Sequence, residues 1–306
     1  MSHTSVSGRK ARACASPRSR RLMRSLGIDP QTVTGSGPGG RIVEADVRRA
    51  HADADGRAAQ CQQTATGLAT DKSRGPGALV PSGTSSMRRA IAHFTTLSAA
   101  VPQFQLRAEV DVTALTVLRE QLLERIEADT RVRLSYTDLL LHAQALALAQ
   151  TREACALWQD GGLVSVESID LGLVVSVPGG LLIPVIRNVD RLGLGELAAE
   201  RSSLVAAARA GKLGSDRLGG GLSSLSNLGN GRVDEFSAIL APPQNSILAV
   251  GSLAPRPFVV DGQLTVRPTL KLTLSADHRV MDGALGAELL GRIVDLLERP
   301  ALLLYR

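Results

Sequence analysis

Aromatic side chains are scarce in this chain: Phe, Trp and Tyr make up 2% of its 306 residues. Proteins that bind single-stranded nucleic acid usually stack bases on aromatic rings, so the composition argues against that class. The cysteines are Cys14, Cys61 and Cys155, an odd number without paired spacing. This pattern indicates neither a disulfide framework nor a zinc site, and it fits a reducing cytoplasm.

Long apolar runs are also missing. The longest uncharged apolar stretch, residues 171–186, is interrupted by Pro178, Gly179 and Gly180, which indicates two strands around a turn instead of a membrane helix. The first residues contain no apolar segment of the signal-peptide type. The sequence therefore predicts no membrane association and no secretion.

The chain does have an uneven distribution of charge. Residues 1–49 hold ten Lys or Arg against three acids, a net charge of +7, whereas the whole chain carries +6. A basic module attached to a nearly neutral body needs an acidic partner. Both nucleic acid and an acidic protein surface satisfy that requirement, although the scarcity of aromatics disfavours nucleic acid.

Composition divides the chain into four parts. Residues 1–13 are predicted to be a disordered leader, and residues 14–50 to contain short helices near 16–26 and 43–50 around a glycine-rich loop. Residues 51–84 lack periodicity and are rich in Ala, Gly, Thr, Gln and Pro, as a flexible linker would be. Helical and strand patterns then alternate over residues 85–306, where the main domain is expected.

This main domain is predicted to be an α/β sandwich with a mixed sheet. The hydrophobic spacing predicts helices and strands. The expected helices are 86–100, 113–128, 135–150, 194–210 and 282–297, and the expected strands are 104–112, 168–177, 181–186, 222–227, 246–251 and 264–275.

The segment "ADHRVMDGA", residues 276–284, places His278 between an expected strand and an expected helix. Loops held by rigid elements often carry reacting groups, and a neutral imidazole can take a proton from a thiol when it is correctly oriented. Asp282 could hold this loop by an ion pair, and Gly283 would let the chain turn into the helix. The alternative is that His278 is only a hydrogen-bonded boundary residue beside a turn.

A second segment, "GLSSLSNLGNGR" at residues 221–232, ends an expected strand with several hydroxyl groups and glycines. Hydroxyls at such a position can donate a hydrogen bond to an oxyanion. Serine and glycine are also ordinary turn residues. Taken alone, the segment is better explained as a turn.

Together these segments resemble the dihydrolipoyl acyltransferase component of the 2-oxo acid dehydrogenase complexes. The matching segments cover nearly all of residues 85–306 in the order of the family: "SMRRAIAHF", "SYTDLLLHA", "GLLIPVIRNVD", "LSNLGNGRVDEFSAILAPPQNSILAVG" and "DHRVMDGALGAELLGRIVDLLERP". The resemblance implies the two-layer sandwich of chloramphenicol acetyltransferase, preceded by a small two-helix peripheral subunit-binding domain.

The resemblance also implies roles for three residues. His278 falls on the general base of the family, Asp282 on the acid of the same motif, and Ser226 on the serine that stabilises the tetrahedral intermediate. The implied reaction moves an acetyl or other short acyl group directly between coenzyme A and a dihydrolipoyl group, without an acyl-enzyme. Similar proteins form trimers, or larger cores, with the site between subunits, so His278 and Ser226 are expected to come from different chains.

The basic module "ASPRSRRLMRSLGIDPQTVTGSGPGGRIVEADVRRA" resembles the peripheral subunit-binding domain, which docks the 2-oxo acid decarboxylase or the dihydrolipoyl dehydrogenase. The contact arginines of that family match Arg20 and Arg41, and Arg21 lies nearby. The alternative is that these arginines form an ordinary solvated basic face. The loop "GSGPGG" satisfies a dinucleotide-binding pattern, but it lacks the strand before it and the acid after it that a nucleotide site needs.

Two departures from the family stand out. No segment matches a lipoyl domain, so either the lipoyl group is supplied in trans by a separate protein, or the sequence is a truncated or diverged copy. Gln103 stands where relatives often have histidine, which bears on details of the substrate channel. The rival interpretation is an inactive assembly scaffold that only recruits partner enzymes. The acyl group stays open, because acetyl, branched-chain and acetoin-type substrates are distinguished by pocket shape.

Overall fold

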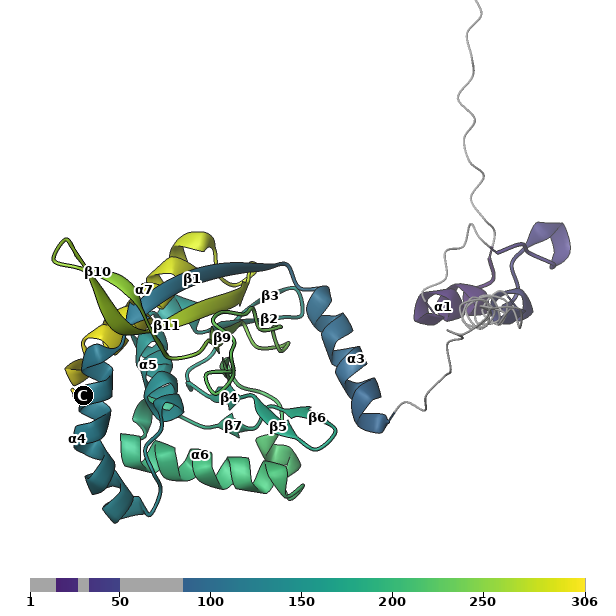
Figure 1. Ribbon diagram of the computed structural model, residues 1–306. Helices are drawn as coiled ribbons and strands as arrows, with labels where there is room; N and C mark the ends of the chain where they lie inside the picture. Colours follow the sequence, from purple (N-terminus) through teal and green to yellow (C-terminus); the bar gives the residue numbers. More distant parts are fainter. Residues whose placement is uncertain (1–14, 27–32, 50–84, 306) are drawn as a thin grey trace, which may run out of the picture. The chain divides into compact units, whose positions relative to one another are not determined.

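The computed structural model describes residues 15–26, 33–49 and 85–305 (Figure 1). The predicted leader 1–13 and linker 51–84 lie outside these residues. The chain divides between Pro81 and Ser82 into two compact units, and each is described by itself.

The first unit is a small helical module. Helix α1 (Pro17–Leu26) begins with proline in its first turn, as expected, and is followed by the short helix η2 (Pro38–Gly40) and a helical turn at 44–49. Its core consists of the buried side chains Ala15, Met23, Val33, Ile42 and Val47, with Leu22 packed against them. A module of this size has few apolar residues, and it buries these in its own core.

The second unit contains five longer helices and eleven strands among the described residues. The helices are α3 (Ser86–Ala99), α4 (Thr113–Thr130), α5 (Tyr136–Gln150), α6 (Leu194–Arg209) and α7 (Gly283–Glu298), with short turns η3 (Arg152–Ala154), η4 (Val189–Arg191), η5 (Ser215–Arg217) and η6 (Pro300–Leu304). The strands are β1 (Gln103–Asp111), β2 (Ala156–Gln159), β3 (Gly162–Ser165), β4 (Leu171–Leu173), β5 (Val175–Val177), β6 (Gly180–Leu182), β7 (Val185–Ile186), β8 (Ser223–Asn227), β9 (Ser246–Val250), β10 (Ala254–Val260) and β11 (Gln263–Asp277).

The main sheet is mixed, as the sequence predicted. Its strand order is β1-β11-β9-β8-β4-β7, and β10 pairs with the first half of β11. Strand β8 runs parallel to both β9 and β4, whereas β1 and β9 are antiparallel to β11. The long strand β11 therefore joins the protruding β10 hairpin to the middle of the sheet (Figure 1).

Helices α4 to α7 contact one another and form a layer on one face of the sheet. Leu225, Leu248 and Leu274 lie level with each other on neighbouring strands and are fully buried in the core beneath these helices. Gly286 of α7 lies so close to β1 that an added Cβ would stand 2.9 Å from the Phe104 ring. Phe104 therefore points toward the helical layer.

Some expected strands were wrong. The expected strand 168–177 is split into β4 of the main sheet and β5 of a separate hairpin, and 181–186 is likewise split into β6 and β7. The β2–β3 hairpin and strand β10 were not among the expected strands. The two missed hairpins are local: β2–β3 turns at Asp160–Gly161 and β10–β11 turns at Asp261–Gly262, and an Asp-Gly pair is a hairpin signal that the sequence contained. The split of 168–177 instead depends on the pairing of β4 with the distant strand β8, which local periodicity does not reveal.

Helix α5 owes its start to a capping box. The Ser135 amide donates to the Asp138 carboxylate at 2.7 Å, and Arg201 of α6 donates to the other oxygen of the same buried carboxylate at 2.5 Å. This arrangement satisfies the helix terminus and ties α5 to α6. None of the helices that the structure describes is long and apolar enough to cross a bilayer.

Candidate active site and partner-binding surface

His278 lies immediately after β11 and before α7, where the sequence placed it. Its backbone amide donates to the Pro102 carbonyl at 2.8 Å, which ties it to the residue preceding β1. Its ring packs at 4.8 Å, centroid to centroid, from the Phe104 ring. The side chain is otherwise exposed in the single chain, so the imidazole is available to a substrate or to a second copy.

Asp282 does not make the ion pair that the sequence analysis expected. It is the N-cap of α7, and its carboxylate accepts a hydrogen bond from the Leu285 amide at 2.8 Å. An acid at a helix N-terminus is stabilised by the orphan amides and the helix dipole. Asp282 therefore fixes where α7 begins, and the ion pair of this loop is formed by other residues.

Asp277 and Arg279, on either side of His278, form that ion pair. The Arg279 Nη2 atom lies 2.7 Å from Oδ2 of Asp277, and its Nε atom lies 2.9 Å from Oδ1. The hydrogen bonds that Arg279 donates to the Asp277 carboxylate raise the pKa of Arg279 above its usual range. This pair was not predicted, although the sequence shows an acid and an arginine on either side of the candidate base.

Ser226 lies on β8, where its side chain is largely buried. The chain after it is held by Asn227, whose side-chain amide donates to the Thr137 hydroxyl at 3.1 Å and whose side-chain oxygen accepts from the Gly229 amide at 2.7 Å. The strand end that carries Ser226 is therefore fastened to the start of α5. A hydroxyl at such a fixed position is suited to donate to a developing negative charge.

One chain does not bring Ser226 and His278 together. Ser226 is level with Ala249 and Thr273 on the neighbouring strands, and His278 follows Thr273 by five residues, which is about 16 Å of strand. Successive side chains on a strand point to opposite faces. Ser226 therefore lies on the face opposite the helical layer, whereas His278 contacts Phe104, which points toward that layer.

Gln103, the first residue of β1, connects this strand to α3 through its side chain. Its side-chain amide donates to the Ser98 carbonyl at 2.8 Å and to the Ser98 hydroxyl at 3.2 Å, in the last turn of α3. A glutamine differs from a histidine in charge and shape, but it still donates hydrogen bonds. In this chain it anchors α3 to the strand that supports His278.

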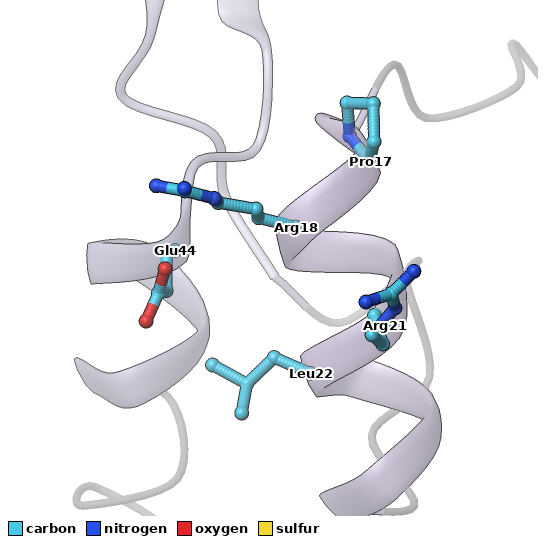
Figure 2. A pocket seen from close by; sticks show the side chains of 5 residues that line it. All are labelled: Pro17, Arg18, Arg21, Leu22 and Glu44. Carbon is cyan, nitrogen blue, oxygen red and sulfur yellow. The ribbon is translucent and has the colours of Figure 1, made fainter.

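The small module presents the predicted arginines to solvent. Arg20, Arg21 and Arg41 are all exposed. A hollow of about 460 Å³ is lined by Pro17, Arg18, Arg21, Leu22 and Glu44. Figure 2 shows Arg18 and Leu22 extending from α1 toward the turn that carries Glu44.

This hollow is lined by two apolar side chains, two guanidinium groups and the Glu44 carboxylate. The two arginines and the apolar side chains suit an acidic partner with aliphatic side chains. Arg18 is a candidate contact that the sequence analysis did not name. Its signal was available, because it stands in the same basic helix as Arg20 and Arg21.

Asp46 organises the glycine-rich loop. Its carboxylate accepts hydrogen bonds from the Ser36 hydroxyl at 2.6 Å, the Ser36 amide at 2.9 Å and the Val43 amide at 3.0 Å. A Cβ at Gly35 would overlap the backbone at Ile42, at 2.7 Å from its nitrogen, so the loop needs glycine there. The loop amides that a phosphate could have used at Ser36 and Val43 donate to Asp46 instead.

Replacing Asp46 by asparagine is expected to unfold this module locally. The hydrogen bonds, chiefly from Ser36, lower the pKa of Asp46 from 3.8 to about 2, so the carboxylate stabilises the folded form above pH 4 and that contribution disappears as the pH falls through 2. An asparagine side chain has one oxygen acceptor in place of two, and its NH2 group, itself a donor, would face one of the N–H groups that now bind the carboxylate. Hydrogen exchange on the full chain at neutral pH should show amide protection in residues 33–49 falling about tenfold or more.

Glu44→Gln is the matched control for that experiment. Glu44 belongs to the same helical turn, but among the described residues its carboxylate pairs only with Arg48, an exposed i,i+4 partner at 2.8 Å. Such pairs contribute little to stability, so protection should be retained. Unchanged protection in the Asp46 variant would contradict the organising role of its carboxylate.

Comparison with known proteins agrees with both units. Residues 81–305 match the family described as 2-oxoacid dehydrogenases acyltransferase (catalytic domain), and residues 13–48 match the e3 binding domain. The chain is 36% identical to the dihydrolipoyllysine-residue acetyltransferase component of the pyruvate dehydrogenase complex of Zymomonas mobilis, over 94% of this chain and 65% of that protein. It thus spans just under two thirds of that relative's length.

Solved structures give the same fold. The dihydrolipoamide acetyltransferase of Azotobacter vinelandii, studied for the role of a serine, a histidine and an asparagine in its catalytic mechanism, matches with a TM-score of 0.70 and 33% identity, over 74% of this chain and 94% of that one. A structure of the cubic core of a pyruvate dehydrogenase multienzyme complex matches with a TM-score of 0.70 and 32% identity, over the same shares. The predicted fold class is therefore confirmed.

Proposed function

Because the chain belongs to the 2-oxo acid dehydrogenase acyltransferase family, we propose that it transfers an acyl group, acetyl as the first choice, between coenzyme A and the dihydrolipoyl arm of a lipoyl domain. In this proposal residues 85–306 carry out the transfer, residues 14–50 dock partner enzymes, and residues 51–84 link the two. The buried free thiol of Cys155 is consistent with a reducing cytoplasm as its location.

The observation that carries the proposal is a match in spacing. The serine and histidine named for the Azotobacter vinelandii protein are 52 positions apart, and its asparagine follows the histidine by four. Ser226 and His278 are also 52 positions apart, and Asp282 follows His278 by four. Aspartate replaces asparagine, and both residue types cap helices well. The spacing supports His278 as the base and Ser226 as the hydroxyl donor.

The proposed reaction is a direct transfer between two thiols. His278 takes the proton from the attacking thiol, and the resulting thiolate adds to the thioester carbonyl. The Ser226 hydroxyl donates a hydrogen bond to the oxyanion of the tetrahedral intermediate. When the intermediate collapses, the second thiolate leaves and takes the proton back from His278. Asp282 contributes by fixing the start of α7 behind the loop.

Two copies of the chain are needed to complete this site. Within one chain, Ser226 and His278 point to opposite faces of the sheet, so a single copy offers each group without the other. A symmetric ring in which the His278 edge of one copy meets the Ser226 face of the next supplies both. We assign a homotrimer as this unit, and the match to a cubic core supports its assembly into a larger particle.

The test is the transfer itself. Purified protein, acetyl-CoA and free dihydrolipoamide should yield S-acetyldihydrolipoamide and coenzyme A, and acyl-CoA esters with longer or branched chains should react more slowly. The rival function, a scaffold that only recruits partners, predicts no transfer above the uncatalysed rate. The decrease in the transfer rate when His278 is replaced then distinguishes enzymatic transfer from the uncatalysed background.

For the module, the proposed partners are the dihydrolipoyl dehydrogenase and the 2-oxo acid decarboxylase. The match to the e3 binding domain, together with exposed Arg20, Arg21 and Arg41 and the hollow beside Arg18, supports a basic surface that meets an acidic one. A lipoyl domain is the third proposed partner, because it carries the acyl group to the site.

Replacing Arg41 by alanine should weaken binding of purified dihydrolipoyl dehydrogenase to the full chain by about tenfold or more, because it removes one partner of a charge pair at an interface. Added salt should weaken wild-type binding as well. Arg209→Ala, which removes an exposed arginine from the end of α6, should leave the affinity unchanged. Binding that is insensitive to both Arg41 and salt would contradict the electrostatic mode.

A further inference from the structure

The turn around His278 is built on Asp277. Asp277 is 3% exposed, and its carboxylate accepts from the Arg279 backbone amide at 3.0 Å as well as from the guanidinium. Its carbonyl accepts from the amides of Val280 and Met281, each at 3.0 Å. His278 lies inside this set of bonds, so the path of its backbone is determined by its two neighbours.

Within one chain, few contacts orient the ring of His278. Within the part of the chain that the structure describes, its imidazole contacts Phe104 but makes no hydrogen bond. Elsewhere, a second hydrogen bond to the imidazole usually orients a catalytic histidine. Here the orientation must come from the turn that carries the side chain.

Arg279 extends this support to a distant hairpin. Its guanidinium carbon lies 5.5 Å from the centre of the Trp158 ring on β2, a cation–π contact. The buried residue Asn245 connects the same two elements: its side-chain amide donates to the carbonyls of Ala154 at 2.6 Å and Ala156 at 2.8 Å, and its carbonyl accepts from the Asp277 amide at 2.9 Å. The hairpin and the His278 turn therefore share one buried anchor.

We propose that Asp277, Arg279 and Trp158 form a clamp that positions the His278 imidazole for proton transfer. Asp277 and Arg279 hold the turn from within, and Trp158 holds the Arg279 guanidinium in place from outside. These are positioning residues, since they act through His278 and touch no reacting atom. The inference rests on the proposed role of His278 as the base. It adds a function for Asp277, Arg279 and Trp158, which the role of His278 alone does not assign.

Steady-state kinetics of Asp277→Asn and Arg279→Lys test the clamp. Asparagine keeps the shape of Asp277 but loses its charge, and lysine keeps the charge of Arg279 but loses the two-pronged contact and the flat face over Trp158. Displacement of a catalytic group by about 1 Å can cost 100-fold in rate, so kcat should fall about 10- to 100-fold. The KM for acetyl-CoA should stay within about twofold, because substrate binding is not altered.

Tryptophan fluorescence provides a readout that does not depend on activity. Trp158 is the single tryptophan of the chain, so all emission excited at its absorption edge comes from the clamp. Both variants should increase quenching by acrylamide, because the guanidinium no longer covers the ring. Arg125→Lys is the control: it alters an exposed pair with Asp129 on α4 and should change neither kcat nor quenching.

A double variant separates this inference from the proposed function. If the clamp acts only through His278, then His278→Ala and His278→Ala combined with Asp277→Asn should be equally slow, whereas a general loss of structure would lower the rate again. Wild-type kcat in both Asp277→Asn and Arg279→Lys, with His278→Ala inactive, would overturn the clamp and leave the proposed function standing. Wild-type kcat in His278→Ala would overturn the proposed function instead.

Discussion

Replacing His278 by alanine is expected to lower kcat for acetyl transfer by about 100- to 10,000-fold, the usual contribution of a positioned general base. Without the imidazole, the attacking thiol must lose its proton to water, and at neutral pH little thiolate is present. The KM for acetyl-CoA should change much less than kcat, because proton transfer is required in the transition state and not in substrate binding. Initial rates with dihydrolipoamide and acetyl-CoA measure both values.

The loss in this variant should not come from unfolding. The His278 side chain is exposed and its described ring contact is with Phe104, so the free energy of unfolding should change by about 0.5 kcal/mol or less. His93→Ala is the matched control, because His93 is also an exposed histidine, on α3. It should keep the wild-type rate. A His278 variant that keeps the wild-type rate would rule out the proposed mechanism.

Mixing two inactive variants is expected to restore activity. Ser226→Ala should be slow by about 100- to 1,000-fold, the usual cost of losing one donor to the oxyanion. Chains with Ser226→Ala still carry His278, and chains with His278→Ala still carry Ser226. If each site combines one group from each of two copies, random mixing in a trimer makes about a quarter of the interfaces complete. The mixture should therefore recover about a quarter of wild-type kcat.

The mixing experiment depends on exchange of chains, so the two variants are unfolded together and refolded, or expressed together with different tags. Each variant treated alone in the same way provides the baseline, and a double variant mixed with wild type shows the effect of dilution. Recovery no greater than the sum of the two variants would mean that Ser226 and His278 act within one chain. That outcome conflicts with their placement on opposite faces of the sheet.

The β2–β3 hairpin illustrates why the sequence gives only part of this structure. Helices α5 and α7 were predictable because a capping residue and the spacing of apolar residues are local signals, and Ser135 and Asp282 supply those caps. Trp158 has no local signal for its contact with Arg279, because that contact depends on the hairpin folding back against the end of β11. The hairpin itself is local, because β2 and β3 pair with each other across the Asp160–Gly161 turn. Its packing against the end of β11 is not local, and sequence patterns do not encode it.

The roles of the Asp282 and Asp46 carboxylates also depend on the tertiary structure. The sequence identified Asp282 as part of the motif but assigned it an ion pair, whereas the fold uses it as a helix cap. No role was predicted for Asp46, although it accepts three hydrogen bonds in the glycine-rich loop. Whether a carboxylate caps, pairs or accepts from a loop depends on which donors the folded chain brings within reach.

The sequence by itself determined the two-part organisation, most helices, the mixed α/β class and the position of His278 between a strand and a helix, since all of these follow from composition, periodicity and motifs within short windows of residues. Only the tertiary structure decided that Ser226 and His278 face opposite sides of one sheet, that Asp277 and Arg279 meet Trp158, and that Arg18 lines a hollow. These features arise from strand register and from contacts between residues far apart in the chain, and no local pattern encodes such pairings.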